Sequence, residues 1–244
     1  MHRFYPDPEQ SRDDLEFLTA DDSRHALTVL RLKSGAQVEV ISDGRRWLAE
    51  IVGEENRIVC VRKLDPLPSS EPKLAVTLFQ GIPKADKMDW IVQKATELGV
   101  SRVVPVAMER SVVRLSAADA VKKVERWQKI SREAGKQSGR CILPDISLPV
   151  TLEQLTAGYD LPSLNVVPWE EADGFGPLAL HETHPEAESL GILIGPEGGI
   201  SVREISLLKA KGFLPITLGK RILRTETAGI AAVASLMCLY GEME

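Results

Sequence analysis

The chain reads L-I-G-P-E-G-G-I-S at residues 193–201 and L-G-K-R-I-L-R-T-E-T-A at residues 218–228. Each of these glycine-bearing stretches follows a short apolar run, over residues 191–194 and 213–218, whose length is typical of a buried β-strand. Each stretch also leads into a predicted helix. The pattern therefore predicts two successive strand, loop and helix units, with both loops at the carboxyl ends of their strands. In open parallel sheets, ligands bind at this edge.

The helix after the first loop has a clear predicted start. Ser201 and Glu204 have the spacing of a capping box, and Ile200 and Ile205 have the spacing of a hydrophobic staple. Gly212 marks the predicted end of this helix.

The first loop is poorly suited to a phosphate group. It has neither of the two glycine-rich phosphate-binding patterns, G-x-G-x-x-G and G-x-x-x-x-G-K-[ST]. Pro196 lacks a backbone N–H, and Glu197 places a carboxylate where a phosphate would have to lie. A ligand that has no phosphate and carries a positive charge suits the loop better, and the sulfonium compound S-adenosylmethionine is such a ligand.

The two motifs resemble the cofactor loops of the SPOUT methyltransferases, whose C-terminal chain passes through a loop as a trefoil knot. Their amino-acid sequences are most similar to those of the RsmE family, the 16S rRNA uracil-N3 methyltransferases. The resemblance covers nearly the whole chain and implies an α/β protein of two domains. Residues 1–68 would form a small PUA-like, RNA-binding β-barrel, and residues 73–244 a SPOUT domain with a parallel sheet and a C-terminal trefoil knot. It further implies S-adenosyl-L-methionine as cofactor, 16S rRNA of the assembled small ribosomal subunit as partner, and a homodimer.

The order of predicted elements agrees with two domains. Apolar and polar residues alternate at 37–41, 47–52 and 57–61, as in the strands of a small antiparallel barrel, and residues 66–72 have the composition of a linker. Strands and helices then alternate, which favours a parallel sheet. The further predicted strands span residues 74–80, 103–107, 143–146 and 164–167, and the predicted helices span residues 86–98 and 116–136.

Basic residues gather in the middle of an acidic chain. The net charge is -5, yet residues 71–140 contain 14 Lys and Arg against 8 Asp and Glu, and residues 141–202 contain no Lys or Arg. A localised basic region indicates nucleic-acid binding, although an ordinary solvated helix face is the alternative. Arginine suits bidentate phosphate contacts. The predicted RNA-binding residues are Arg3, Arg24, Arg31, Arg110, Arg132, Gln137 and Arg140.

Arg224, Glu197 and Glu226 are the predicted catalytic residues. A cation at a helix N-terminus gains nothing electrostatically, so Arg224 is predicted to stabilise negative charge on the uracil carbonyls. Glu197 or Glu226 would take the N3 proton. The structural alternative is a tight turn followed by a helix capped by Thr225. The predicted cofactor contacts are Val167, Leu193, Gly195, Glu197, Gly198, Leu218, Gly219, Ile222, Leu223 and Arg224.

Other features bear on compartment and assembly. Cys60, Cys141 and Cys238 stand singly among apolar residues, which predicts buried, reduced thiols. No apolar stretch is long enough to cross a bilayer, so we expect a cytoplasmic protein. No metal is expected, because no residue group has the spacing of a complete ligand set. The helix predicted at residues 228–240 is apolar nearly all round, which favours a two-fold dimer interface over internal burial alone.

Two other functions fit the same sequence. One is a SPOUT enzyme that acts on tRNA or on a ribose hydroxyl, and the other is a non-catalytic RNA-binding protein of this fold.

Overall fold

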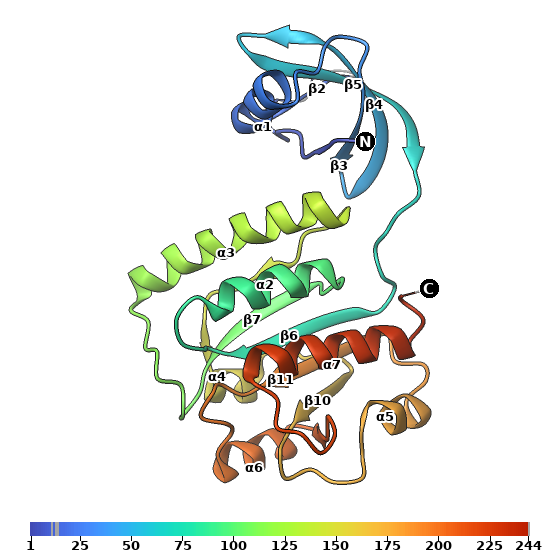
Figure 1. Cartoon of the computed structure of the whole chain (residues 1–244). Coiled ribbons are helices and arrows are strands. Elements are labelled where there is room, and N and C mark those ends of the chain that lie inside the picture. Colours follow the sequence, from blue (N-terminus) through green and yellow to red (C-terminus); the bar gives the residue numbers. More distant parts are fainter. Residues whose placement is uncertain (11, 13–14, 244) are drawn as a thin grey trace. The chain divides into compact units, whose positions relative to one another are not determined.

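The computed structural model describes residues 1–10, 12 and 15–243, so Ser11, Asp13, Asp14 and Glu244 of the two predicted domains lie outside it. The described chain forms two compact units. The first comprises residues 1–71 and 135–142, and the second comprises residues 72–134 and 143–244. Figure 1 shows the elements of both units.

The first unit is built on a five-stranded sheet with the order β1-β3-β4-β5-β2. An isolated bridge between Pro6 and Leu18 joins the chain after β1 to the chain after β2, so the two edges of the sheet meet as in a small barrel. Its core contains Phe4, Leu18, Val40 and Val61. The strands are β1 (Arg3–Phe4), β2 (Leu15–Phe17), β3 (Gln37–Ser42), β4 (Arg45–Glu55) and β5 (Ile58–Leu67), and the helix α1 (Ala20–Arg24) continues into a π-helical turn, η1 (His25–Val29).

The second unit is built on a parallel sheet with the order β12-β10-β11-β6-β7-β8, in which β9 also pairs with β7. This confirms the predicted parallel sheet. The strands are β6 (Ala75–Gly81), β7 (Arg102–Ala107), β8 (Asp145–Ile146), β9 (Val150–Thr151), β10 (Leu164–Pro168), β11 (Ser189–Ile194) and β12 (Phe213–Ile216). The helices are α2 (Lys87–Glu97), α3 (Ala117–Ser138), α4 (Leu152–Gly158), α5 (Pro177–Thr183), α6 (Val202–Ala210) and α7 (Thr225–Leu239), and the last turn of α3 belongs to the first unit.

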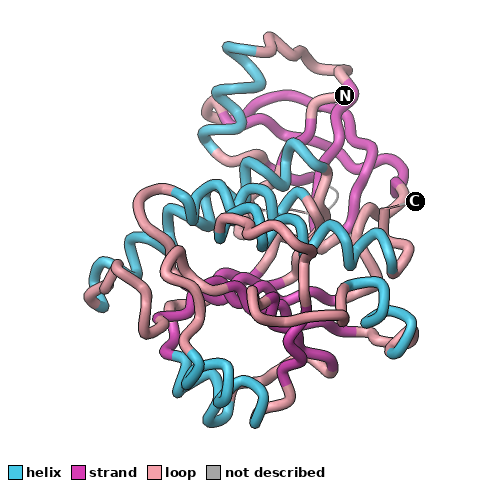
Figure 2. Tube along the Cα trace, turned by 60° about the horizontal axis from the view of Figure 1, so that its bottom comes forward, coloured by secondary structure: helices cyan, strands magenta, loops and turns pink. Residues whose placement is uncertain are grey.

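Helices cover both faces of this sheet (Figures 1 and 2). Alternate residues of each strand point to opposite faces, so Leu78 of β6 joins one core cluster while its neighbour Phe79 joins the other. The first cluster packs against α2, α3, α5 and α7, and the second against α4 and α6. The sheet is therefore buried on both faces. Ligands can reach it at the loops that follow the strand ends.

The predicted helix starts agree with the structure where side chains cap them. Ser201 Oγ accepts a hydrogen bond from the backbone N–H of Glu204, and the Glu204 carboxylate accepts one from the N–H of Ser201 at 2.9 Å. The capping box is therefore confirmed. Helices α4 and α5 have seven residues each, which is too short for a hydrophobic period to show in the sequence.

Two further expectations can be compared with the described residues. No helix among them is both long enough and apolar enough to cross a bilayer. Cys60 and Cys141 are buried, but the prediction is wrong for Cys238, which is exposed on α7. Because α7 is apolar on nearly all sides, the sequence pattern did not reveal which side faces outward.

Candidate functional site

A buried chain of hydrogen bonds joins three strand ends of the second unit. The hydroxyl of Thr225, the first residue of α7, donates to the carbonyl of Gly195 in the first loop at 2.6 Å. The same hydroxyl accepts from the side-chain amide of Gln80, in β6, at 2.9 Å. Gln80 and Thr225 are both buried. The two glycine-bearing loops are thus fixed to each other and to the end of β6.

The first loop is packed so closely that two of its contacts require glycine. A Cβ atom added at Gly195 would lie 2.6 Å from Ile200 Cγ1, and one added at Gly81 would lie 2.7 Å from Pro196 Cδ. The glycine at 195 therefore lets the loop fold back on its own Ile200, which itself precedes the capped start of α6. A side chain added at Gly195 or Gly81 would therefore collide with atoms of the loop itself and change the loop conformation.

Lys87 brings together the two carboxylates predicted to act in catalysis. Its Nζ lies 3.0 Å from Glu197 Oε1 and 3.1 Å from Glu226 Oε2. Glu197 also accepts a hydrogen bond from the backbone N–H of Lys84 at 3.1 Å. Sequence reasoning missed Lys87, because a lysine at the start of an amphipathic helix looks like an ordinary surface residue. Its one signal was its position at the start of the helix that follows a strand of the parallel sheet.

These contacts shift the protonation equilibria of the cluster. Partial burial favours the neutral form of Glu197, but hydrogen bonds from Lys87 and from backbone amides outweigh it, so the pKa of this carboxyl lies below its ordinary value. Hydrogen bonds to Glu197 and Glu226 raise the pKa of Lys87. At neutral pH Lys87 is therefore charged and Glu197 is ionised.

The loop after β7 also reaches the first loop. Arg110 Nη1 donates to the carbonyl of Gly198 at 3.1 Å, and a Cβ added at Gly198 would lie 2.8 Å from Arg110 Cβ. Next to it, Ser201 Oγ donates to Glu109 Oε2 at 2.9 Å. Arg110 is exposed, so a predicted RNA-binding residue stands directly beside the predicted cofactor loop.

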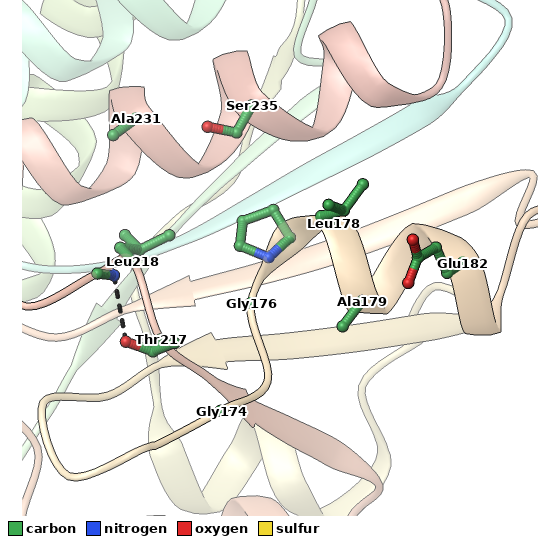
Figure 3. Close-up of a pocket in the computed structure, with 11 residues that line it drawn as sticks. Gly174, Gly176, Leu178, Ala179, Glu182, Thr217, Leu218, Ala231 and Ser235 are labelled. Carbon is green, nitrogen blue, oxygen red and sulfur yellow. Dashed lines mark hydrogen bonds between the residues drawn. The ribbon is translucent and has the colours of Figure 1, made fainter.

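A pocket of about 490 Å³ opens between α5, α7 and the second loop (Figure 3). Two predicted cofactor contacts, Leu218 and Gly219, line it, and the N–H of Gly219 donates to Thr217 Oγ1 at 3.1 Å. Among the described residues that line it, Glu182 is the charged one. An acidic pocket with apolar walls suits a cationic, phosphate-free ligand. Its lining residues are Gly174, Gly176, Pro177, Leu178, Ala179, Glu182, Thr217, Leu218, Gly219, Ala231 and Ser235.

The remaining predicted cofactor residues lie elsewhere around the loops. Val167 and Leu193 are fully buried in the core beneath α4 and α6, whereas Ile222 is 84% exposed. Leu223 is half-buried. Arg224 is exposed at the N-cap position of α7, and its side chain makes no capping hydrogen bond there. Because a guanidinium has no acceptor atom with which to cap a helix N-terminus, the role of Arg224 stays a prediction.

The predicted RNA-binding residues of the first unit fall into two groups. Arg24, Arg31 and Gln137 are exposed, and Arg24 pairs with Asp21 at 2.9 Å. Arg3 and Arg140 instead have partners within the unit.

Arg140 is only 4% exposed, and its Nη2 lies 2.9 Å from Glu71 Oε2. Arg3 Nε lies 2.8 Å from Glu39 Oε2, and Arg3 Nη1 donates to the carbonyl of Lys136 at 2.7 Å. RNA contacts by these two arginines stay a prediction, and they would require both ion pairs to open. Arg132, which belongs to the second unit, is half-buried.

A metal ion has no evident place among residues 1–10, 12 and 15–243, where no three His, Cys, Asp or Glu side chains are grouped to hold one.

Comparisons with known proteins follow the two units. The family described as RNA methyltransferase domain matches residues 70–237, and the family described as RNA methyltransferase PUA domain matches residues 18–64. Ribosomal RNA small subunit methyltransferase E of Bacillus subtilis is 34% identical over 225 residues, which cover 90% of this chain and 88% of the relative. The Aquifex aeolicus protein of the same name is 34% identical over 238 residues, covering 97% and 99%. The chain belongs to the ribosomal RNA small subunit methyltransferase E (RsmE) family.

Solved structures support the same assignment. The RsmE protein of Neisseria gonorrhoeae, bound to S-adenosyl methionine, has a TM-score of 0.86 at 32% identity, and the match covers 100% of both chains. A putative methyltransferase of Legionella pneumophila, in complex with its cofactor SAM, has a TM-score of 0.84 at 32% identity, covering 97% of this chain and 96% of the other. The RsmE resemblance and the expected combination of a parallel α/β sheet with a small PUA-like unit are confirmed.

Proposed function

We propose that this protein is an S-adenosylmethionine-dependent methyltransferase that methylates N3 of one uridine in 16S rRNA. One observation carries the proposal. A chain that matches RsmE proteins over nearly its whole length keeps both loop motifs, and it joins them through the hydrogen bond from Thr225 to Gly195. A non-catalytic RNA-binding protein would have no need for a cofactor site in which these two loops are joined.

S-adenosylmethionine is supported as cofactor by the chemistry of the loops. It supplies a methyl group bonded to a positively charged sulfur. The first loop presents Glu197 and lacks a phosphate-binding pattern, and the pocket beside the second loop carries the carboxylate of Glu182. Leu218 and Gly219 line that pocket and would hold the cofactor together with the backbone of the first loop. We propose Leu193, Ile222 and Leu223 as the residues around its adenine, and Val167 as a further cofactor contact.

Arg224 is the proposed catalytic residue for charge stabilisation. Loss of the N3 proton leaves negative charge on the uracil carbonyls, and an exposed guanidinium at the edge of the cofactor loop can neutralise it. Glu197 is a weak base, because its pKa is lowered, and an efficient base has a pKa near the working pH. For Glu197 we therefore favour a role in loop structure. Glu226 pairs with the same lysine, and this ion pair competes with the uptake of a proton by Glu226.

RNA binding is proposed to involve both predicted domains, residues 1–68 and 73–244. The exposed residues Arg24 and Arg31 are proposed phosphate contacts in the first, and Arg110, Arg132 and Gln137 in the second. Arg110 supports this best, because its guanidinium donates to Gly198 and so lies beside the cofactor loop. We propose 16S rRNA of the assembled small ribosomal subunit as the substrate and the cytoplasm as the location.

A homodimer and the trefoil knot complete the proposal. The buried residues of α7, including Ala232, Val233 and Leu236, pack inside the second unit, while Ala231, Ala234 and Cys238 on the same helix are partly or fully exposed. A second apolar side supports a dimer interface along α7. The knot is proposed on the resemblance of the two loop motifs to those of the SPOUT methyltransferases.

The test uses purified protein, S-adenosylmethionine and small ribosomal subunits that lack the modification. A methyl group at N3 lies on the pairing face of uracil and blocks reverse transcription. We expect a new strong stop at one uridine of 16S rRNA. Methyl groups found on ribose or on tRNA would contradict the substrate assignment, and the absence of any methyl transfer would contradict the enzymatic function.

A further inference from the structure

One ammonium group holds carboxylates from two different loops. Lys87 is the first residue of α2 and follows β6, Glu197 lies in the first loop after β11, and Glu226 lies in the first turn of α7 after β12. Both carboxylates are within 3.1 Å of the Lys87 Nζ. Their side chains and that of Lys87 are 25%, 18% and 30% exposed, so the solvent screens their attraction only in part.

The two carboxylates have unequal support without this lysine. Glu226 lies at the N-terminus of α7, where the helix dipole favours a negative charge. Glu197 belongs to a loop whose other polar links include the hydrogen bond of Thr225 with Gly195, the backbone N–H of Lys84 and the contact of Arg110 with Gly198. Removal of Lys87 would leave two negative charges close together, and their repulsion would move the first loop away from α7.

We propose that Lys87 is a positioning residue of the cofactor site, which holds the first loop against the start of α7 and so sets the spacing of the two loops that bind S-adenosylmethionine. The inference rests on the proposed function, because that spacing matters only if the loops bind the cofactor. Lys87 complements the hydrogen bond between Thr225 and Gly195: the hydroxyl fixes the base of the loops, and the ion pairs fix their more exposed part.

The role makes cofactor binding depend on the charge of Glu197. The charged groups that face this carboxylate are Lys87 from α2 and Glu226 from α7, with Lys84 next to it in the chain segment that leads to α2. Without Lys87, partial burial and the negative charge of Glu226 would both favour the protonated form of Glu197. Mild acid would then neutralise Glu197 and relieve the repulsion, whereas in the natural protein the lowered pKa of Glu197 keeps it ionised and paired with Lys87.

The experiment measures the dissociation constant of S-adenosylmethionine by calorimetry between pH 5.5 and 8 on full-length variants. Lys87→Met should weaken binding about tenfold at pH 7.5, an effect between those of exposed and buried ion pairs, and binding should partly recover toward pH 5.5, where protonation of Glu197 removes the repulsion. Lys87→Arg should retain most of the affinity and the flat pH profile. The matched control is Lys94→Met, which removes a lysine of the same helix that pairs with Glu97 at 2.9 Å and should leave binding unchanged.

A double variant separates the proposed role from simple loss of folding. Lys87→Met with Glu226→Gln removes the repulsion as well as the lysine, and it should regain most of the affinity at pH 7.5. A double variant that binds as weakly as Lys87→Met at pH 7.5 would overturn the inference, as would a Lys87→Met protein with the affinity and pH profile of the natural chain. Failure of the natural chain to bind S-adenosylmethionine at any pH would instead overturn the proposed function.

Discussion

The hydroxyl of Thr225 donates a hydrogen bond of 2.6 Å to the carbonyl oxygen of Gly195, and so joins the start of the last helix to the first glycine-bearing loop. The hydroxyl oxygen of Thr225 in turn accepts from the side-chain amide of Gln80, which is fully buried. A buried polar group that loses its hydrogen-bond partner destabilises the fold. The Thr225 side chain therefore makes the geometry of the two loops depend on Gln80 of β6.

Thr225→Val tests this relationship, because valine keeps the shape of threonine and removes the hydroxyl. The half-buried Gly195 carbonyl and the buried Gln80 amide would each lose a partner, so we expect a loss of about 1–3 kcal/mol in the free energy of unfolding and weaker S-adenosylmethionine binding. Urea denaturation and calorimetry measure the two effects. Thr227→Val, at an exposed position of the same helix, is the control and should change neither.

Gly195→Ala should damage the first loop through its packing. The new Cβ would lie 2.6 Å from Ile200 Cγ1, so the loop must shift, at a cost of about 1–3 kcal/mol, and cofactor affinity should fall. Adding Ile200→Ala makes room and should restore part of the stability. Gly158→Ala, where no atom lies within 4 Å of the new Cβ, should be tolerated. Equal effects of the two glycine substitutions would contradict the packing argument.

Arg224→Ala should separate chemistry from binding. Because the side chain is exposed and makes no capping hydrogen bond, we expect unchanged stability and nearly unchanged cofactor affinity. Methyl transfer should fall about a hundredfold or more, the size associated with loss of one donor to the transition state. Single-turnover assays on small subunits measure the rate. Arg221→Ala in the same loop is the control, and an undiminished rate in Arg224→Ala would remove the role assigned to this arginine.

Arg140→Ala and Arg24→Ala should act on different properties. Arg140 is buried against Glu71, so its removal leaves a partly buried carboxylate without its ion-pair partner, held by backbone N–H donors such as that of Ile142, and should destabilise the protein by about 1–3 kcal/mol. Arg24 forms an exposed pair with Asp21, so its removal should cost at most about 1 kcal/mol.

RNA affinity distinguishes these two arginines further. If Arg24 contacts a phosphate, its loss should reduce the slope of log affinity against log salt by about one. Binding measured in a salt series gives this slope, and an unchanged slope in Arg24→Ala would exclude the contact.

Stability in acid should depend on Glu197. Its pKa is lower in the folded protein than the ordinary value of 4.5, so the folded state binds this proton less readily than the unfolded chain. The stabilisation is complete above the ordinary value and disappears as the pH falls through the lowered one. The melting temperature of Glu197→Gln should therefore lie below that of the natural protein at pH 7, and the difference should vanish in strong acid. A difference that is the same at every pH would contradict the assignment.

Local chain chemistry made several features readable in the sequence. The capping box of Ser201 and Glu204, the buried side of α2 around Ile91 and the strand before each loop depend on residues that are near neighbours in the chain. Hydrophobic periodicity and capping express such short-range interactions directly. The two motifs likewise sufficed for the family, because each is a continuous stretch.

The tertiary structure alone decided which distant side chains meet. No residue near Lys87 in the sequence predicts that it pairs with Glu197 and Glu226. Only the parallel order of β6, β11 and β12 brings the loops that carry the three residues to one edge of the sheet. The burial of Arg140 against Glu71 and the exposure of Cys238 likewise depend on contacts between residues that are far apart in the chain. Ion pairs and burial depend on contacts between residues far apart in the chain, and composition, charge and period along the chain do not specify those contacts.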